Sequence, residues 1–91
     1  MDLQLPEDTT ADLLRRLARI EGQVRGVQAR LREGRECREI VAQLSAVGKA
    51  VDQVGFKMLA TGMAACLANP DVASKSGFDL EEVERLFLKL A

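Results

Sequence analysis

The sequence predicts an all-α chain of three helices, because its apolar residues recur at alternating spacings of three and four. No segment shows the strict alternation of apolar and polar residues that is typical of half-buried strands. Of the 91 residues 47% are hydrophobic, yet only three are aromatic, which suits helices that pack against other helices. The length predicts one domain over residues 1–91, whose core is marginal without a partner.

The first predicted helix follows a flexible tail, residues 1–8, and ends at Gly34. Asp8, Thr9 and Thr10 are good N-cap residues, and Pro6 does not continue a helix backwards. Gly34 offers a stop. Between these signals the apolar residues form a heptad seam: Leu13, Leu17, Ile20, Val24, Val27 and Leu31.

Two further helices are predicted after Gly34. The second runs from about residue 36 to residue 68, because no proline interrupts it before Pro70. The third follows Asp79, which forms a capping-box pattern with Glu82. The second helix has its own heptad seam: Cys37, Ile40, Leu44, Val47, Val51, Val54 and Met58.

The long second helix predicts self-association. A helix of that length extends about 50 Å, whereas a compact globule of this size has a radius of gyration of about 12 Å. A monomer would leave most of the seam uncovered. We therefore expect an antiparallel helical-bundle homodimer, which can assemble further into a dimer of dimers.

Several classes of protein are excluded by what the sequence lacks. The chain has no histidine, no paired catalytic carboxylates and no glycine-rich phosphate loop, so we expect it not to be an enzyme. Residues 1–8 do not resemble a targeting segment, and the longest uncharged stretch, residues 58–70, is too short to span a membrane. We expect a cytoplasmic protein with reduced thiols and no membrane partner.

Cys37 and Cys66 are separated by 29 positions, or about 43 Å along one helix. They cannot pair within a chain, but an antiparallel dimer brings Cys37 of one chain beside Cys66 of the other. Arg35 and Arg38 near Cys37, together with the first helical turn, favour a reactive thiol. The alternative is that both cysteines are small buried hydrophobic residues.

The net charge of −1 conceals a basic first helix. Residues 12–35 contain seven arginines and three carboxylates, whereas residues 1–11 carry −3 and residues 36–91 carry −2. Arginines suit bidentate contact with phosphate, and a dimer or tetramer would multiply the patch. A solvated face with ion pairs within the helix explains the same composition.

Residues 11–90 resemble the copper-sensing operon repressor (CsoR) family of bacterial transcriptional repressors. The resemblance is carried by the segment LRRLARIEGQVRGV at residues 14–27, by Cys37 followed by QLSAV at residues 43–47, and by Cys66. It implies antiparallel helical dimers that assemble into a flat tetramer. It also implies binding to double-stranded operator DNA, which an inducer at the inter-subunit cysteines weakens.

Within the family, the copper sensors have a histidine four residues before the second cysteine, where this chain has Gly62. The two cysteines without a third ligand resemble the persulfide-sensing (CstR-like) branch. That resemblance implies a persulfide or polysulfide inducer that links Cys37 and Cys66 between chains and releases the operator, with no cofactor. One alternative is a Cu(I)-responsive repressor whose metal is held by these two thiolates, and another is a helical scaffold with structural cysteines.

The family resemblance also implies roles for charged residues. Arg16 occupies the basic position early in the first helix and is the first candidate for contact with DNA. Glu82 matches a position that couples the inducer site to DNA binding, although the capping box explains it equally well. The remaining candidates for DNA contact are Arg15, Arg19, Arg25, Lys49 and Lys57.

Overall fold

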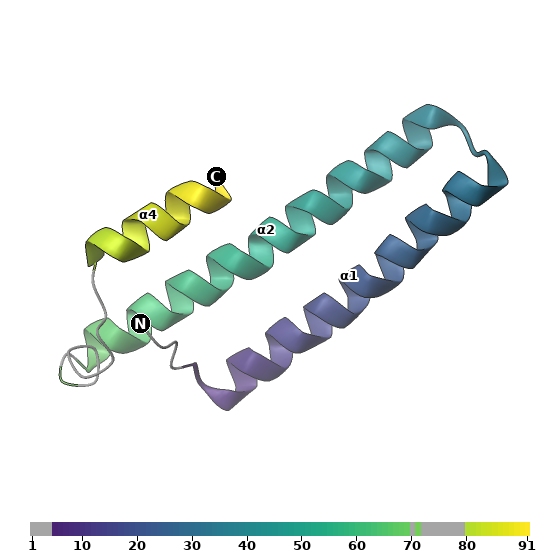
Figure 1. Ribbon diagram of the computed structural model, residues 1–91. Coiled ribbons are helices and arrows are strands. Elements are labelled where there is room, and N and C mark those ends of the chain that lie inside the picture. Colours follow the sequence, from purple (N-terminus) through teal and green to yellow (C-terminus); the bar gives the residue numbers. More distant parts are fainter. Residues whose placement is uncertain (1–4, 70, 72–79) are drawn as a thin grey trace.

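The computed structural model describes residues 5–69, 71 and 80–91, but not the side chains of residues 65, 66 and 80. The regular structure in these ranges is helical: α1 spans Glu7–Glu33, α2 spans Cys37–Ala68 and α4 spans Leu80–Leu90 (Figure 1). The prediction of an all-α chain is confirmed, and so is the extent of the long helix. Asp79, the first residue of the predicted capping box of the third helix, lies outside the described residues.

Helix α1 begins at Glu7, before the predicted tail boundary at residue 8. Pro6 is the N-cap residue, and its carbonyl accepts the first helical hydrogen bond, from the Thr10 N–H at 3.0 Å. The extended conformation of Pro6, with φ −57° and ψ 147°, is typical of an N-cap residue. Acidic side chains in the first turn interact favourably with the helix dipole. Glu7 and Asp8 therefore lie inside the helix and not in a tail.

Gly34 ends α1 as predicted, in the left-handed conformation with φ 67° and ψ 38°. The Gly34 N–H donates to the Leu31 carbonyl at 3.3 Å, and the Arg35 N–H donates to the Arg30 carbonyl at 3.1 Å. This pair of hydrogen bonds is a Schellman motif, which favours glycine because no side chain opposes the positive φ. The chain then reverses direction within two residues and enters α2 at Cys37.

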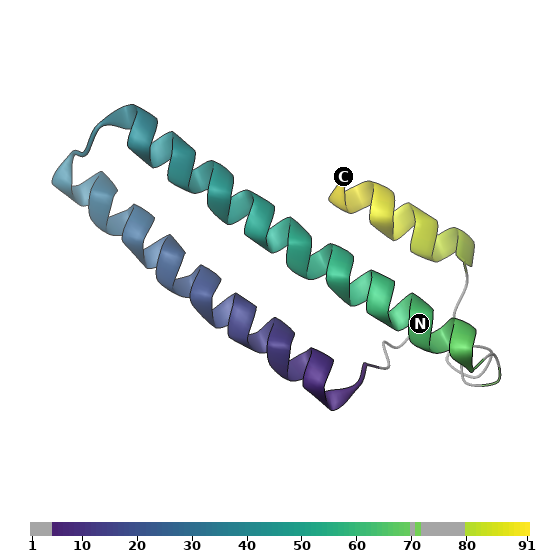
Figure 2. The ribbon, with the colours of Figure 1, turned by 180° about the vertical axis from the view of Figure 1, so that it is seen from behind.

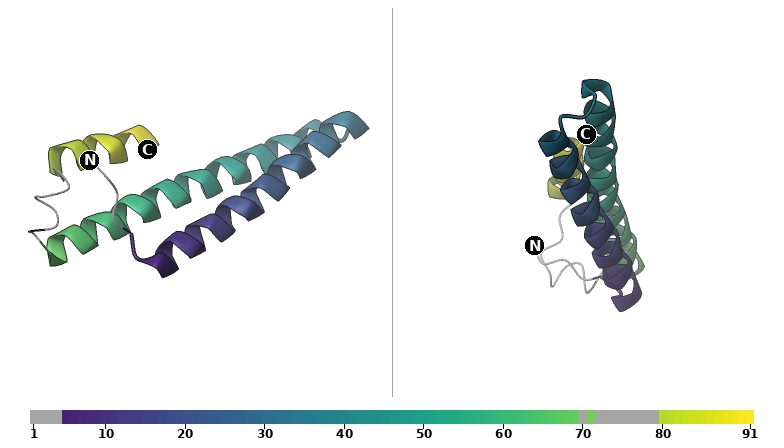
Figure 3. Two further views of the ribbon diagram at one scale, coloured as in Figure 1. Left: turned by 60° about the horizontal axis from the view of Figure 1, so that its bottom comes forward. Right: turned by 90° about the vertical axis from the view of Figure 1, so that its right-hand side faces the viewer.

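Helices α1 and α2 form a long antiparallel hairpin, and α4 lies along the C-terminal half of α2 on the edge away from α1 (Figures 1 and 2). The molecule measures 54 × 25 × 15 Å, and its radius of gyration is 16.9 Å. A compact chain of this length would have a radius of gyration of about 12 Å. The hairpin is thus a thin layer with two broad faces, as the two further views also indicate (Figure 3).

The heptad seam of α1 divides into two halves. Leu13, Ile20 and Val27, seven residues apart, are only 5–8% exposed and pack toward α2. The intervening seam residues remain on the surface, with exposed fractions of 39–60%: Leu17, Val24 and Leu31. One chain therefore uses only half of its seam.

Helix α4 attaches to α2 through a small apolar contact. Val83 is the most buried of the core residues, at 2% exposure, and the rings of Phe56 and Phe87 stack with centroids 5.8 Å apart. Gly55 permits the approach, because a Cβ at this position would lie 2.8 Å from Leu90 Cδ1. No helix in the described part of the chain is long and apolar enough to cross a membrane.

Candidate functional site

The two faces of the α1–α2 hairpin carry different side chains. On α1 the buried stripe of Leu13, Ile20 and Val27 is flanked by two stripes of the same seven-residue period. The two flanking stripes fall on opposite sides because successive residues are about 100° apart. On α2 the half-buried stripe of Ile40, Val47 and Val54 is flanked in the same way. One face, the polar face, carries Arg16, Gln23 and Arg30 from α1 and Gln43 and Lys57 from α2. The other, the apolar face, carries five half-exposed residues: Leu17, Val24, Leu31, Leu44 and Val51.

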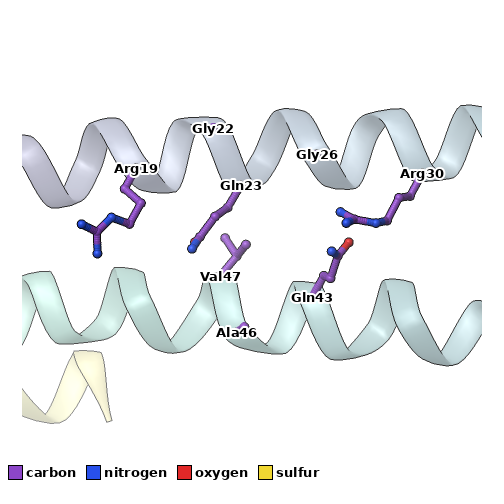
Figure 4. Close-up of a pocket in the computed structure, with 8 residues that line it drawn as sticks. All are labelled: Arg19, Gly22, Gln23, Gly26, Arg30, Gln43, Ala46 and Val47. Carbon is purple, nitrogen blue, oxygen red and sulfur yellow. The ribbon is translucent and has the colours of Figure 1, made fainter.

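A groove on the polar face lies between α1 and α2 and has a volume of about 450 Å³. The guanidinium groups of Arg19 and Arg30 project into it from α1, and the Gln43 side chain rises toward Arg30 from α2 (Figure 4). Gln43 Oε1 is buried and has no hydrogen-bond partner in the described structure. The groove is lined by Arg19, Gly22, Gln23, Gly26, Arg30, Gln43, Ala46 and Val47.

The basic candidates predicted for DNA contact do not form one patch. Arg16 and Arg19 line a second hollow on the polar face, with Ala50 and Gln53 across from them. Arg25 instead lines a hollow beside the apolar residues Leu17 and Val24.

Lys49 is exposed on α2 and lies three residues after Ala46 and four before Gln53. Residues at these spacings are neighbours on a helix, which puts Lys49 at the border of the polar face. Arg30 and Gln43 were not predicted as site residues. The signal that identifies Arg30 is its seven-residue spacing from Gln23 and, in turn, from Arg16.

Asp12 joins three of the basic candidates in one cluster. Its Oδ2 accepts hydrogen bonds from Lys57 Nζ at 2.6 Å and from Arg16 Nε at 3.0 Å, while Arg15 Nη2 lies 3.8 Å from Oδ1. The hydrogen bond from Lys57, and then that from Arg16, lowers the pKa of Asp12 below its usual value of 3.8. The Lys57 bond also ties α2 to the first part of α1.

The two cysteines lie at opposite ends of α2. Cys37 is its first residue and a free, exposed thiol. Cys66 lies in the last turn of the same helix, whose end is Ala68, and its side chain is outside the description. Since one straight helix carries both residues, about 43 Å apart along its axis, they cannot pair within a chain.

The Arg35 guanidinium near Cys37 is paired with two carboxylates, Glu39 at 3.2 Å and Glu33 at 3.8 Å. The backbone N–H of Arg38 donates to Glu36 Oε2 at 3.1 Å. The positive charge of Arg35, which was expected to favour a reactive thiol at Cys37, is therefore balanced by the carboxylates of Glu33 and Glu39. Cys37 is exposed in a single chain, and both the reactive thiol and the alternative of a buried cysteine stay predictions for the assembled protein.

Glu82 is exposed in the first turn of α4. Its proposed capping partner Asp79 lies outside the described residues, so both interpretations of Glu82 stay predictions. Among the described residues there is no group of three or more histidine, cysteine or acidic side chains that could hold a metal ion. With no histidine in the chain, the donor set does not fit a site of two cysteines and one histidine.

Comparison with known proteins identifies the family of the chain. The model of the metal-sensitive transcriptional repressor family matches residues 9–89. The chain is 39% identical over 71 residues to the copper-sensing transcriptional repressor CsoR of Bacillus subtilis (strain 168), covering 78% of this chain and 67% of that protein.

It is also 32% identical over 65 residues to the copper-sensing transcriptional repressor RicR of Mycobacterium tuberculosis (strain ATCC 25618 / H37Rv), covering 71% of this chain and 68% of that protein. No solved structure matches the chain significantly. The function is thus transcriptional repression through DNA and not catalysis. Since the family match spans nearly the whole of the helical hairpin and α4, the chain belongs to the CsoR family of metal-sensitive transcriptional repressors.

Proposed function

We propose that this repressor releases its operator when persulfide or polysulfide joins Cys37 of one chain to Cys66 of a second. The observation that carries the proposal is the placement of both cysteines at the two ends of one helix, in a chain without histidine. A symmetric antiparallel pair of such helices has a dithiol site at each end. Reaction with persulfide needs only the two thiols. The site of two cysteines and one histidine in the copper sensors needs an imidazole, which this chain lacks.

The apolar face is the surface through which the chains associate. Its leucines and valines are half exposed in a single chain, and a second hairpin laid against them antiparallel would form a four-helix bundle. Burying such side chains contributes roughly 1.5–3 kcal/mol each when it is complete. A dimer of dimers extends the same assembly and leaves the polar faces for DNA. A repressor that works on operator DNA acts in the cytoplasm.

The sensing reaction has two steps. The Cys37 thiolate attacks the outer sulfur of a low-molecular-weight persulfide, forms a protein persulfide and expels the corresponding thiolate. The Cys66 thiolate of the second chain then attacks the inner sulfur of that persulfide and expels hydrosulfide, which leaves an inter-chain disulfide. The small persulfide is the oxidant, and it is reduced to a thiol and hydrogen sulfide. Additional sulfur atoms from further persulfide would lengthen the bridge to a polysulfide.

DNA binds across the polar face in this proposal. Arg16 and Lys57 approach each other from α1 and α2, and Arg19, Arg15 and Lys49 extend the positive surface around them. Arg25 contributes less, because it lies beside the apolar face. A bridge at the ends of the bundle favours the assembly with lower DNA affinity, and Glu82 on α4 couples the two sites.

Cross-linking of cysteine variants tests the sensing site. Treated with inorganic tetrasulfide, the reduced protein should give covalent dimers with two bridges by intact mass, whereas Cys37→Ser or Cys66→Ser alone should give none between these positions. A mixture of the two variants rebuilds one complete site per heterodimer, so we expect one bridge. If only unmodified monomer is found, the persulfide proposal is wrong.

A second candidate function is Cu(I) sensing, which is favoured by the names of the two relatives. The thiolates of Cys37 and Cys66 from two chains would be the ligands, since soft thiolates suit Cu(I). The residues offer no third ligand of the usual kind. Stoichiometric Cu(I) binding in competition with a strong chelator, lost in Cys66→Ser, would favour copper over persulfide. Because the chain belongs to a family of transcriptional repressors, the third interpretation, a helical scaffold that binds no DNA, is rejected.

A further inference from the structure

One carboxylate, that of Asp12, binds the basic side chains that we propose contact DNA. A single oxygen, Oδ2, accepts from both Lys57 Nζ and Arg16 Nε, and Arg15 is close to the other oxygen. This is the arrangement that a phosphate oxygen would make with the same donors. The cations remain partly open to solvent, with 42% of the Lys57 side chain and 44% of the Arg16 side chain exposed. Phosphate can therefore reach them.

The electrostatic balance of the cluster depends on this one group. Arg15, Arg16 and Lys57 supply three positive charges, and Asp12 cancels one of them at hydrogen-bond distance. DNA affinity depends on how many cations exchange their counterions for phosphates. Asp12, which already binds Arg16 and Lys57, acts as a counterion that is covalently attached to the protein. Unlike a free anion, it does not exchange with salt in solution.

We propose that Asp12 is an internal competitor for DNA phosphate, which ties Arg16 to Lys57 in the free protein and gives way to the phosphate backbone on binding. The inference rests on the proposed function, in which the polar face binds DNA. The competition lowers affinity for any duplex, so that the weak background binding contributed by phosphates alone is reduced. Operator binding, which adds contacts to bases, overcomes the competition.

The same interaction has a second consequence, because Lys57 and Asp12 are 45 residues apart in sequence and lie on different helices. Displacement of Asp12 by phosphate breaks this polar link between α1 and α2. Lys57 lies on the same helix as Cys66, nine residues before it. DNA binding thus changes a contact on the helix that carries the thiols.

Four variants of the reduced protein, one of them Arg16→Ala, test the proposal with a mixed-sequence DNA duplex as the probe. Asp12→Asn keeps the side-chain shape but removes the charge, and it should bind the duplex about two- to tenfold more tightly. Its salt dependence should be steeper by about 0.9 for each cation that is freed. Lys57→Gln breaks the same inter-helix link but should weaken binding. Asp52→Asn, an equal change of charge at an exposed α2 residue outside the polar face, is the control.

The results separate the inference from the proposed function. If Asp12→Asn weakens binding as Lys57→Gln does, the carboxylate positions the cations and the competition is disproved. If Asp52→Asn strengthens binding equally, only net charge matters and the inference also fails. If Arg16→Ala and Lys57→Gln leave DNA binding unchanged, the polar face is not the DNA surface, and the proposed function fails instead. Helical circular dichroism of each variant checks that it is folded.

Discussion

The two faces of the α1–α2 hairpin are built from one heptad pattern but differ in chemistry. Next to the buried stripe of Leu13, Ile20 and Val27, the residues before Leu17 and Val24 are Arg16 and Gln23. A step of one position in the sequence therefore changes the face from apolar to polar. The comparison teaches that a thin, two-helix layer can assign one side to self-association and the other to DNA without any further domain.

The largest effect is expected from a charge on the apolar face. Val24→Asp places a carboxylate where a second chain would bury it, and an unpaired buried charge costs several kcal/mol. We expect loss of the dimer and of DNA binding, measured by sedimentation equilibrium and by fluorescence anisotropy with duplex DNA. The matched change one position earlier, Gln23→Asp, should weaken DNA binding and leave the assembly intact. Equal loss of assembly in both variants would contradict the division into faces.

Arginines on the two faces should differ in their effect on DNA. Arg16→Ala removes a cation from the polar face, so we expect weaker duplex binding and a salt slope that is shallower by about 0.9. Arg25→Ala removes the same charge from the other side and should change the slope less. An Arg25 effect as large as that of Arg16 would show that DNA reaches both faces.

The turn that holds the faces in register depends on Gly34. Gly34→Ala keeps the sequence pattern but places a side chain at φ 67°, and the free energy of unfolding should fall by about 1 kcal/mol. The loss can be measured by denaturant unfolding at fixed protein concentration, because self-association contributes to stability. Arg32→Ala is the control, because it also introduces alanine near the end of α1 but at a residue without a positive φ. Unchanged stability of Gly34→Ala would mean that the Schellman turn is not required.

The smallest effect is expected from titration of Asp12. Because hydrogen bonds from Lys57 and Arg16 lower the pKa of Asp12 in the folded chain below its usual value of 3.8, the stability contributed by the cluster is present above that usual value and is lost as pH falls through the lower folded pKa. The cluster is partly exposed, so the effect is small. Comparison of wild type and Asp12→Asn by thermal unfolding from neutral to acidic pH should show less acid sensitivity in the variant.

The extent and order of the helices could be predicted because their signals are local. Gly34 and the uninterrupted stretch before Pro70 fixed the ends of α1 and α2, and the spacing of Cys37 and Cys66 followed from a single helix. The start of α1 was less certain, since Pro6, Asp8, Thr9 and Thr10 are all suited to a helix N-terminus.

Which face of the hairpin each basic residue lies on could not be predicted in the same way. Composition and helix periodicity identify an arginine-rich α1, but they do not say which arginines share a face with α2. The contact of Asp12 with Lys57 and the burial of the Gln43 amide oxygen depend on how α1 and α2 are rotated against each other.

The sequence by itself determined the helical class, the long α2 with a cysteine at each end, and the absence of imidazole ligands, because periodicity and composition are properties of one chain. Only the tertiary structure decided which half of each heptad seam faces inward. That choice depends on the packing of α1 against α2, because burial of Leu13, Ile20 and Val27 fixes the rotation of the helix and so exposes Leu17 and Arg16 on opposite faces.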